Sequence, residues 1–222
     1  MGLNLINIFS VQLFAEISIV VNDVITSFLD EQFQKLSPLE INIIYWIALR
    51  RNSASLIQLR RDTIKGVTVV SPADLFNTLD SLIEKHSLVD KNKNEEDEPD
   101  VHTLDLVILK YITNLFVEQS FYEILQIIEN QRIKGYELFL THSFITENPE
   151  NEELTQEQIK RIIKPIHNKL LIQLQSQQRV EEELSKISSL LEDRGFSQEY
   201  AHQNILYLIS DRQQLHGAIA TS

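Results

Sequence analysis

The stretch LSPLEINIIYWIALRR, residues 36–51, decides the fold of this chain. Ser37, Pro38 and Glu40 have the pattern of a helix start: serine caps the first turn, proline suits its first position, and glutamate can bind the cap amide. The residues that follow are apolar on nearly every side of such a helix, so we expect it to be buried. A buried helix around Trp46, the one tryptophan of the chain, predicts the centre of a folded domain.

Two short elements follow this helix. The spacing of apolar residues predicts a helix over residues 55–63, and the β-branched run after Gly66 predicts a strand over residues 66–70. In the short helix we expect the leucines to face inward and the arginines outward, namely Leu56, Leu59, Arg60 and Arg61.

Residues 71–104 predict a further helix and a hairpin. Ser71 opens a capped helix that ends near His86. Strands over residues 87–90 and 101–104 flank the polar loop KNKNEEDEPD, which predicts a hairpin with a long tip. The order helix, helix, strand, helix, hairpin predicts a winged helix. One apolar face is expected on the capped helix, formed by Leu75, Phe76, Leu79, Leu82 and Ile83.

The second half of the chain predicts only helices. A long apolar helix is expected over residues 105–130, then one over 156–175 that opens with a capping pattern at Thr155 and is kinked at Pro165. Two more are expected, one from residue 180 to a Gly195 C-cap with Phe196 and one from a Ser197 cap to residue 210. The predicted class is mainly α, a winged helix with a small β-hairpin wing followed by an α-helical bundle. The expected domains are residues 1–35, 36–130 and 131–222.

Composition and charge restrict the function. Lys and Arg total 20 against 32 Asp and Glu, so the formal charge of −12 repels nucleic acid phosphates and anionic membranes. No cysteine is present, which fits a cytoplasmic location. The apolar run Leu3–Val21 has no basic flank and is interrupted by polar residues, so we expect an amphipathic helix rather than a signal peptide or a membrane span.

Several segments, in this order, resemble a known family. They are LDEQFQKLSPLEINIIYWIALRRNSASLIQLRRD, VSPADLFNTLDSLIEKHSLVDK, HTLDLVILKYIT, QIKRIIKPIHNKLL and GFSQEYAHQNILYLI. They are similar to the winged-helix and helical-linker region of cyanobacterial STAND-type NB-ARC NTPases, which are usually followed by a WD-repeat propeller or pentapeptide repeats. The linker often carries a Gly-Tyr-x-x-x-Asn-Leu-Leu pattern, represented here by Gly195-Phe196 and Asn204-Ile205-Leu206. Under this resemblance residues 1–35 are a remnant of the helical ARC region.

The nucleotide-binding parts of that family are missing. None of the five glycines belongs to a Gly-x-x-x-x-Gly-Lys-Ser/Thr run, so the sequence has no P-loop. The family has a histidine that meets ADP at the start of the last winged-helix helix, but Leu104 stands at that position, and we expect Leu104 in the core with Asp105 as an N-cap. The resemblance therefore implies a truncated, split or decayed protein without nucleotide binding.

DNA binding is the alternative function, because many winged helices bind DNA. The predicted helix after Ser71 is net acidic on its polar side, and the wing tip is acidic as well. Both would oppose phosphate contact, so a protein-interaction role is preferred. A basic cluster near the first helix is the candidate interaction surface, formed by Arg50, Arg51, Arg60 and Arg61.

Catalysis and metal binding have no candidate residues. The six histidines form no His-Glu-x-x-His pattern, the acidic loop lacks EF-hand spacing, and no Gly-x-Ser-x-Gly elbow occurs. We therefore expect no enzyme activity, cofactor or metal, and a regulatory module that binds protein partners, such as a separately encoded NTPase core or propeller. A remnant with no function of its own is a further alternative.

Overall fold

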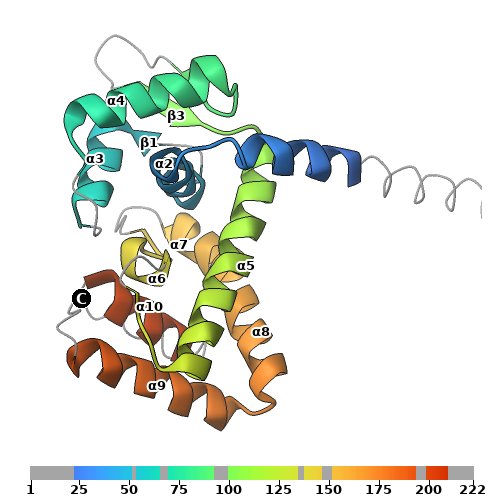
Figure 1. Ribbon diagram of the computed structural model, residues 1–222, viewed down its shortest axis with the longest axis vertical. Helices are drawn as coiled ribbons and strands as arrows, with labels where there is room; N and C mark the ends of the chain where they lie inside the picture. Colours follow the sequence, from blue (N-terminus) through green and yellow to red (C-terminus); the bar gives the residue numbers. More distant parts are fainter. Residues whose placement is uncertain are drawn as a thin grey trace, which may run out of the picture. The chain divides into compact units, whose positions relative to one another are not determined.

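The structure is a computed structural model that describes residues 23–51, 54–65, 70–92, 100–134, 138–146, 152–193 and 199–209. Within these residues the protein is mainly helical, with one small antiparallel sheet (Figure 1). This confirms the predicted mainly α class. The chain forms two compact units, Met1–Ile41 and Asn42–Ser222. The three predicted domains stay a prediction.

The described part of the first unit contains a helix over residues 23–33 and the start of α2 (Pro38–Leu49). The predicted capping box of α2 is present. The Ser37 amide donates to Glu40 Oε2 at 2.6 Å, and the Glu40 amide donates to Ser37 Oγ at 3.3 Å. The helix predicted over Leu3–Val21 lies outside the described residues.

The sheet contains β1 (Ala54–Ser55), β2 (Asp90–Asn92) and β3 (Val101–Thr103), in the spatial order β1-β3-β2. All pairs are antiparallel, with Ala54 opposite His102 and Asp90 opposite Thr103. The β2–β3 hairpin confirms the predicted pairing, although β2 begins at Asp90 rather than ending there. Residues 93–99, within the predicted tip, lie outside the described residues.

The strand predicted over residues 66–70 lies outside the described residues except for Val70, which is in no strand. The strand β1 was not predicted. A two-residue strand has no periodicity that a sequence pattern can register, and β1 is defined by its pairing with β3.

The helices from α3 onward mostly match the predicted ranges. Their bounds are α3 (Leu56–Lys65), α4 (Pro72–Asp80), α5 (Leu106–Asn130), α6 (Leu138–Thr141), α7 (Glu152–Gln158), α8 (Lys164–Leu174), α9 (Gln177–Asp193) and α10 (Glu199–Ile209). Two π-helical turns, η1 (Ser81–Lys85) and η2 (Ile159–Ile163), continue α4 and α7.

Two predicted N-caps are confirmed in this series. Ser71 Oγ accepts from the Asp74 amide at 3.1 Å at the start of α4. Asp105 Oδ1 accepts from the Val107 amide at 2.8 Å at the start of α5, and Leu104 before it is buried, as predicted. The predicted Gly195 and Ser197 caps lie outside the described residues.

The start predicted at Thr155 is wrong. The helix already runs from Glu152, and the Gln158 side chain binds distant groups instead of the cap. Pro165 lies in the first turn of α8, directly after the π-helical turn η2. A proline at this place removes one helical hydrogen bond, so the change of helix type coincides with the predicted irregularity.

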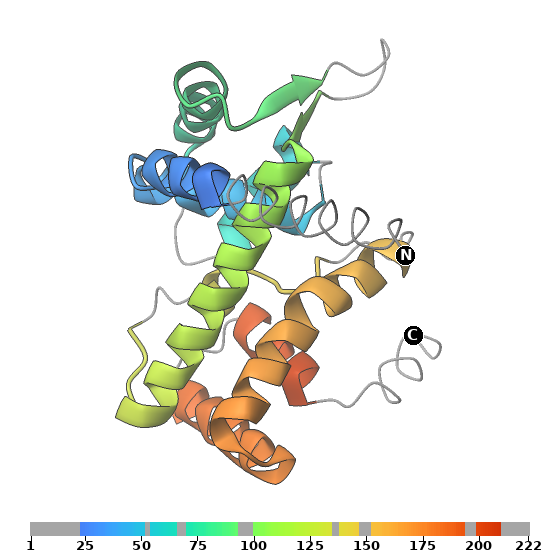
Figure 2. The same cartoon turned by 90° about the vertical axis from the view of Figure 1, so that its right-hand side faces the viewer.

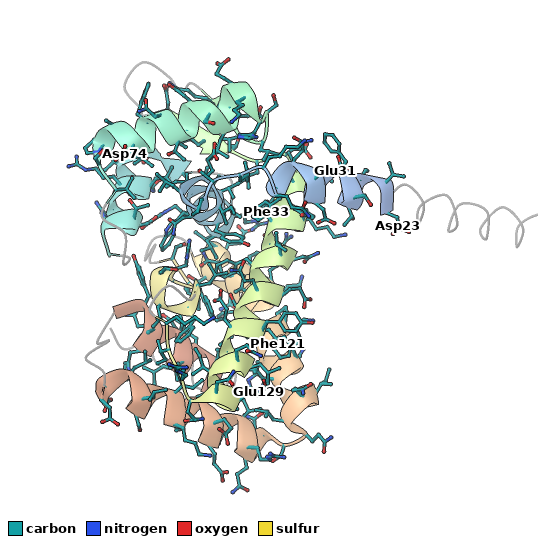
Figure 3. All side chains as sticks on the ribbon, in the orientation of Figure 1. Asp23, Glu31, Phe33, Asp74, Phe121 and Glu129 are labelled. Carbon is teal, nitrogen blue, oxygen red and sulfur yellow. The ribbon has the colours of Figure 1, made fainter. Side chains whose placement is uncertain are left out.

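The helix α5 connects the sheet to the helical half of the second unit. It follows β3 directly and packs against α6, α8 and α9 (Figures 1 and 2). Phe121 is buried on α5 (Figure 3). The Lys169 ammonium of α8 lies 5.6 Å from the centroid of the Phe121 ring. One continuous helix therefore runs from the sheet to the helices α6, α8 and α9.

The core lies around α2, as the sequence predicts. Five consecutive residues, Ile43 to Ile47, are each at most 1% exposed. His142 stacks on Trp46 with the ring centroids 4.9 Å apart, and Tyr45 and Phe116 meet the imidazole edge to face. The only tryptophan is thus at the centre of an aromatic cluster.

A nine-residue stretch, Leu138–Thr146, passes through this core, and every one of its residues is buried. We call it the buried segment. Its backbone groups find partners on side chains from three helices. The Leu138 amide donates to Glu123 at 2.6 Å, Asn204 binds three backbone groups, and the Thr146 amide donates to Gln158 at 3.2 Å.

The burial of His142 predicts a loss of stability in acid. Burial lowers the pKa of His142 from 6.5 to about 4, while its hydrogen bond to the Asn42 carbonyl acts in the opposite direction. Between these two values the unfolded chain binds a proton that the folded chain does not, so stability falls as pH falls and levels off below about 4. We expect a loss of about 2 kcal/mol between pH 7.5 and 5 from this group.

Urea unfolding of the wild type and of His142→Gln over this pH range measures the effect. The variant is expected to have a shallower pH dependence, even if it is less stable at every pH. Equal slopes in the two proteins would contradict the assignment.

Among the residues that the structure describes, no helix combines the length and the apolar character that a bilayer crossing requires.

Candidate functional site

The four predicted arginines do not form one exposed cluster. Arg50, at the end of α2, donates two hydrogen bonds to Asp62 of α3, at 2.5 and 2.8 Å. The side chains of this pair are only 10% and 7% exposed. The Arg50 guanidinium therefore forms a nearly buried ion pair and is not part of an exposed basic cluster. Its partner Asp62 has no sequence pattern that predicts this role.

The other three arginines lie at or near the surface. Arg51 is 3.9 Å from Glu153 and 4.0 Å from Glu157. The hydrogen bond from Arg161 chiefly, and the charge of Arg51 as well, hold the pKa of Glu157 below its usual value. Arg60 and Arg61 are exposed on α3. An interaction surface at these three arginines stays a prediction.

Arg50 and Arg61 come together at one small hollow. It measures about 50 Å³, and its wall also includes Trp46, Asp62 and Tyr200. A volume of this size holds only a few water molecules. It is too small for a docked side chain of a partner.

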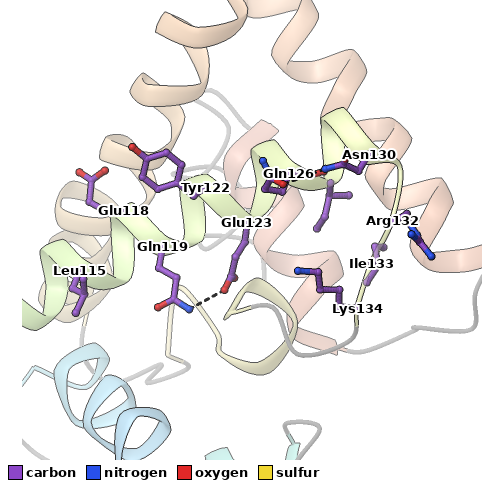
Figure 4. Close-up of a pocket in the computed structure, with 11 residues that line it drawn as sticks. Leu115, Glu118, Gln119, Tyr122, Glu123, Gln126, Asn130, Arg132, Ile133 and Lys134 are labelled. Atoms are coloured by element: carbon purple, nitrogen blue, oxygen red, sulfur yellow. Dashed lines mark hydrogen bonds between the residues drawn. The ribbon is translucent and has the colours of Figure 1, made fainter. Parts of the chain in front are cut away.

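A larger hollow lies along the C-terminal half of α5. It measures about 990 Å³, and its lining combines polar and apolar residues, among them Gln119, Glu123 and Ile133 (Figure 4). Its wall residues already bind one another and the core: Gln119 accepts from the Tyr45 hydroxyl of α2 at 3.0 Å and donates to Glu123 at 2.9 Å.

Glu123 in turn accepts from the Leu138 amide, and Glu118 at the same hollow pairs with Lys169 at 2.8 Å. The burial of the Tyr45 hydroxyl raises its pKa, so it stays a neutral donor in this chain of hydrogen bonds. These groups hold the fold, so the larger hollow is not our candidate site.

A second, smaller groove lies beside the sheet. It measures about 300 Å³ and is formed by the start of α3, by α4 with η1, and by β2 and β3. We call it the α3–α4 groove. The residues that line it are Leu56, Ile57, Phe76, Leu79, Asp80, Ile83, Lys91, Asp100 and His102.

Three large apolar side chains of the α3–α4 groove are exposed. Leu56 is 40% exposed, Ile57 65% and Phe76 53%. The prediction that Leu56 faces inward is therefore wrong, whereas Leu59 is buried as predicted. On the predicted apolar face of α4 and η1, Leu75, Leu79 and Leu82 are buried and Phe76 is exposed. Exposed large apolar residues that gather at a hollow mark an interaction site more often than single ones do.

A sequence signal for this groove did exist. Leu56, Ile57 and Leu59 are three apolar residues within four positions of one helix. Because successive residues are 100° apart, they spread over an arc of about 160°, which is wider than the apolar stripe of an ordinary surface helix. The pattern indicates surplus apolar surface but not which residue carries it.

The polar wall of the groove is formed by the sheet. His102 of β3 is buried and hydrogen-bonds the Ala54 carbonyl through Nδ1 at 3.1 Å. Its burial lowers its pKa below the usual value, so the ring is neutral near pH 7. Lys91 and Asp100 pair across the hairpin at 3.0 Å. The groove is thus apolar on its helical side and polar where the sheet closes it.

A metal centre has no support among the described residues, since no group of three or more carboxylate or imidazole side chains is gathered there. The arrangement of the α3–α4 groove offers a surface for binding rather than groups for chemistry.

Comparison with known proteins gives one relative. An uncharacterized WD repeat-containing protein of Nostoc sp. (strain PCC 7120 / SAG 25.82 / UTEX 2576) is 28% identical to this chain over 220 residues. The alignment covers 86% of this chain and 16% of that protein, so the chain spans a small part of its relative. No protein-family model matches the chain. No solved structure matches it either. The chain is thus similar to one part of a cyanobacterial WD repeat-containing protein.

Proposed function

We propose that this chain is a non-catalytic protein-interaction module, and that it corresponds to the middle part of a STAND-type signalling NTPase. The α3–α4 groove carries the proposal, because its exposed leucine, isoleucine and phenylalanine fit a protein surface better than any other ligand. The similarity to part of a WD repeat-containing protein supports a context of protein contacts.

The order of elements supports a winged helix in the first half of the second unit. The order α2, β1, α3, α4, β2, β3, with β3 between the two other strands, is that of three helices and a two-stranded wing. In this assignment the predicted second and third helices are α3 and α4. The strand between the first two helices is β1.

The long helix α5 makes this module a connector. Its 25 residues extend over about 37 Å at the rise of an α-helix. Because α5 starts at the sheet and ends beside α9, a partner bound at the α3–α4 groove is linked to the helical half through one rigid element (Figure 2). In this proposal the module acts in the cytoplasm and relays contact between an NTPase core and a propeller.

DNA binding is the second candidate, favoured only by the winged-helix order and by Arg60 and Arg61. In a winged-helix assignment α4 is the recognition helix, yet α4 presents Asp74 and Asp80 to solvent along with Phe76. Asp74 lies on the first turn of α4 (Figure 3). These carboxylates repel phosphates and reduce the number of favourable contacts.

A mobility-shift assay decides between the two functions. With random and genomic DNA at low salt, we expect no shift at concentrations where a known winged-helix DNA binder shifts fully. A shift that weakens as salt rises, and that is lost in Arg60→Ala/Arg61→Ala, would show the phosphate contacts of a DNA-binding protein. That result would replace the proposed function by the second candidate.

A further inference from the structure

The α3–α4 groove carries enough chemistry to describe its partner. We propose that it binds an amphipathic helix of another protein, whose apolar face enters the groove and whose flanking residues are lysine or arginine. This inference rests on the proposed function and specifies the partner of the same site.

The apolar side chains at the groove require an apolar occupant. Ile57 and Phe76 are more than half exposed, although Leu79 next to Phe76 is buried, so the groove has a buried floor and an exposed rim. Covering the rim removes this surface from water, which is the main favourable term in association. Aromatic residues such as Phe76 are enriched at interfaces of this kind.

The shape of the groove favours a helix. Two helical walls, the start of α3 and the α4–η1 run, provide the apolar side chains on both sides. A groove of this form accepts apolar residues spaced three and four apart on one helix face. The π-helical turn η1 contains Ile83 of the groove, and such turns occur frequently at functional sites.

The charge of the groove favours a basic flank. Lys91 and Asp100 neutralise each other in their ion pair. Among the described lining residues this leaves Asp80, an exposed carboxylate at the end of α4. Glu84 is exposed one turn after Asp80, whereas the exposed Arg60 lies one turn after Leu56 on the α3 side. A lysine or arginine that arrives beside Asp80 is therefore attracted, and an acidic residue there is repelled.

Two synthetic peptides test this inference with the full chain. Both carry the same leucine face at helical spacing, but one is flanked by lysines and the other by glutamates. In fluorescence anisotropy at low salt, the lysine peptide is expected to bind about fivefold tighter than the glutamate peptide. This ratio of affinities corresponds to the contribution of one exposed ion pair. Asp80→Lys is expected to remove or reverse this preference.

Variants of the rim test the apolar part. Phe76→Asp and Ile57→Asp change exposed residues, so both variants are expected to fold. Each is expected to lower the affinity for the lysine peptide at least about tenfold. Tyr122→Asp is the matched control, because Tyr122 is 59% exposed on α5 away from the groove, and it should leave binding unchanged.

Three results would overturn the inference. The first is that neither peptide binds. The second is that both peptides bind equally and Asp80→Lys changes neither affinity. The third is that Tyr122→Asp weakens binding as much as Phe76→Asp does. The mobility-shift assay tests the proposed function separately. Failure of peptide binding without a DNA shift indicates a protein-interaction module that docks elsewhere, whereas a DNA shift indicates a DNA-binding protein.

Discussion

Replacing Asn204 by alanine is expected to lower the free energy of unfolding by about 3 kcal/mol. Asn204 is fully buried on α10, and its amide binds three backbone groups of the buried segment at 2.8 Å: the Phe144 amide, the Phe139 carbonyl and the His142 carbonyl. The alanine leaves these buried groups without their partner. A backbone group in that position is costly because no other interaction replaces the lost one.

Asn130→Ala is the matched control for this effect. Asn130 is exposed at the end of α5, and its amide binds only Gln126 in the preceding turn. Its replacement is expected to change stability by less than about 0.5 kcal/mol. Urea unfolding followed by circular dichroism measures both variants. Equal effects would mean that Asn204 does not hold the buried segment in place.

Removing one partner of the Arg50–Asp62 pair is expected to lower the free energy of unfolding by about 3 kcal/mol. The pair joins α2 to α3, and its side chains are nearly buried. Arg50→Met leaves the Asp62 carboxylate without its cation, and Asp62→Leu leaves the guanidinium without its anion. Because the desolvation cost disappears when both charges are removed, the double variant is expected to be more stable than either single variant.

The Arg161–Glu157 pair is the exposed control for this cycle. Its N···O distance is 2.7 Å, but the side chains are 48% and 23% exposed. Arg161→Met is expected to cost less than about 1 kcal/mol, because water already solvates both groups. An additive double variant at Arg50 and Asp62 would show that the two charges do not interact.

These two predictions concern residues whose roles the sequence did not reveal. The pattern of four arginines within residues 50–61 predicts a basic face, and nothing in the order of residues indicates that Arg50 turns inward to Asp62. Sequence spacing places side chains around a helix axis but does not identify the neighbouring element. Arg50 therefore lies in a nearly buried ion pair, while an interaction surface at the other arginines stays a prediction.

Local signals were more reliable than distant ones. The Ser37–Glu40 capping box involves groups three positions apart, and the structure has both of its hydrogen bonds. The Thr155–Gln158 pattern has the same spacing, yet Gln158 donates to the Leu49 carbonyl at 2.6 Å and to Thr146 at 2.7 Å. A buried amide binds whichever groups the fold brings near, and these lie far away in the sequence.

The groove was missed for a related reason. The helical spacing of Leu75, Phe76 and Leu79 is that of an apolar face, and the core covers only Leu75 and Leu79. Phe76 lies one position beside Leu75, so it reaches the edge of that face and not its centre. A sequence pattern shows the width of an apolar face but not how much of it the rest of the chain covers.

Site-specific photo-crosslinking tests the central claim, a protein-interaction module that docks through the α3–α4 groove, most directly. A benzophenone amino acid replaces Phe76 in one protein and Tyr122 in another, and each is irradiated in the host cell. We expect a covalent adduct with one defined protein from position 76 and none from position 122. Adducts with nucleic acid at position 76, or the same protein adducts at both positions, would contradict the claim.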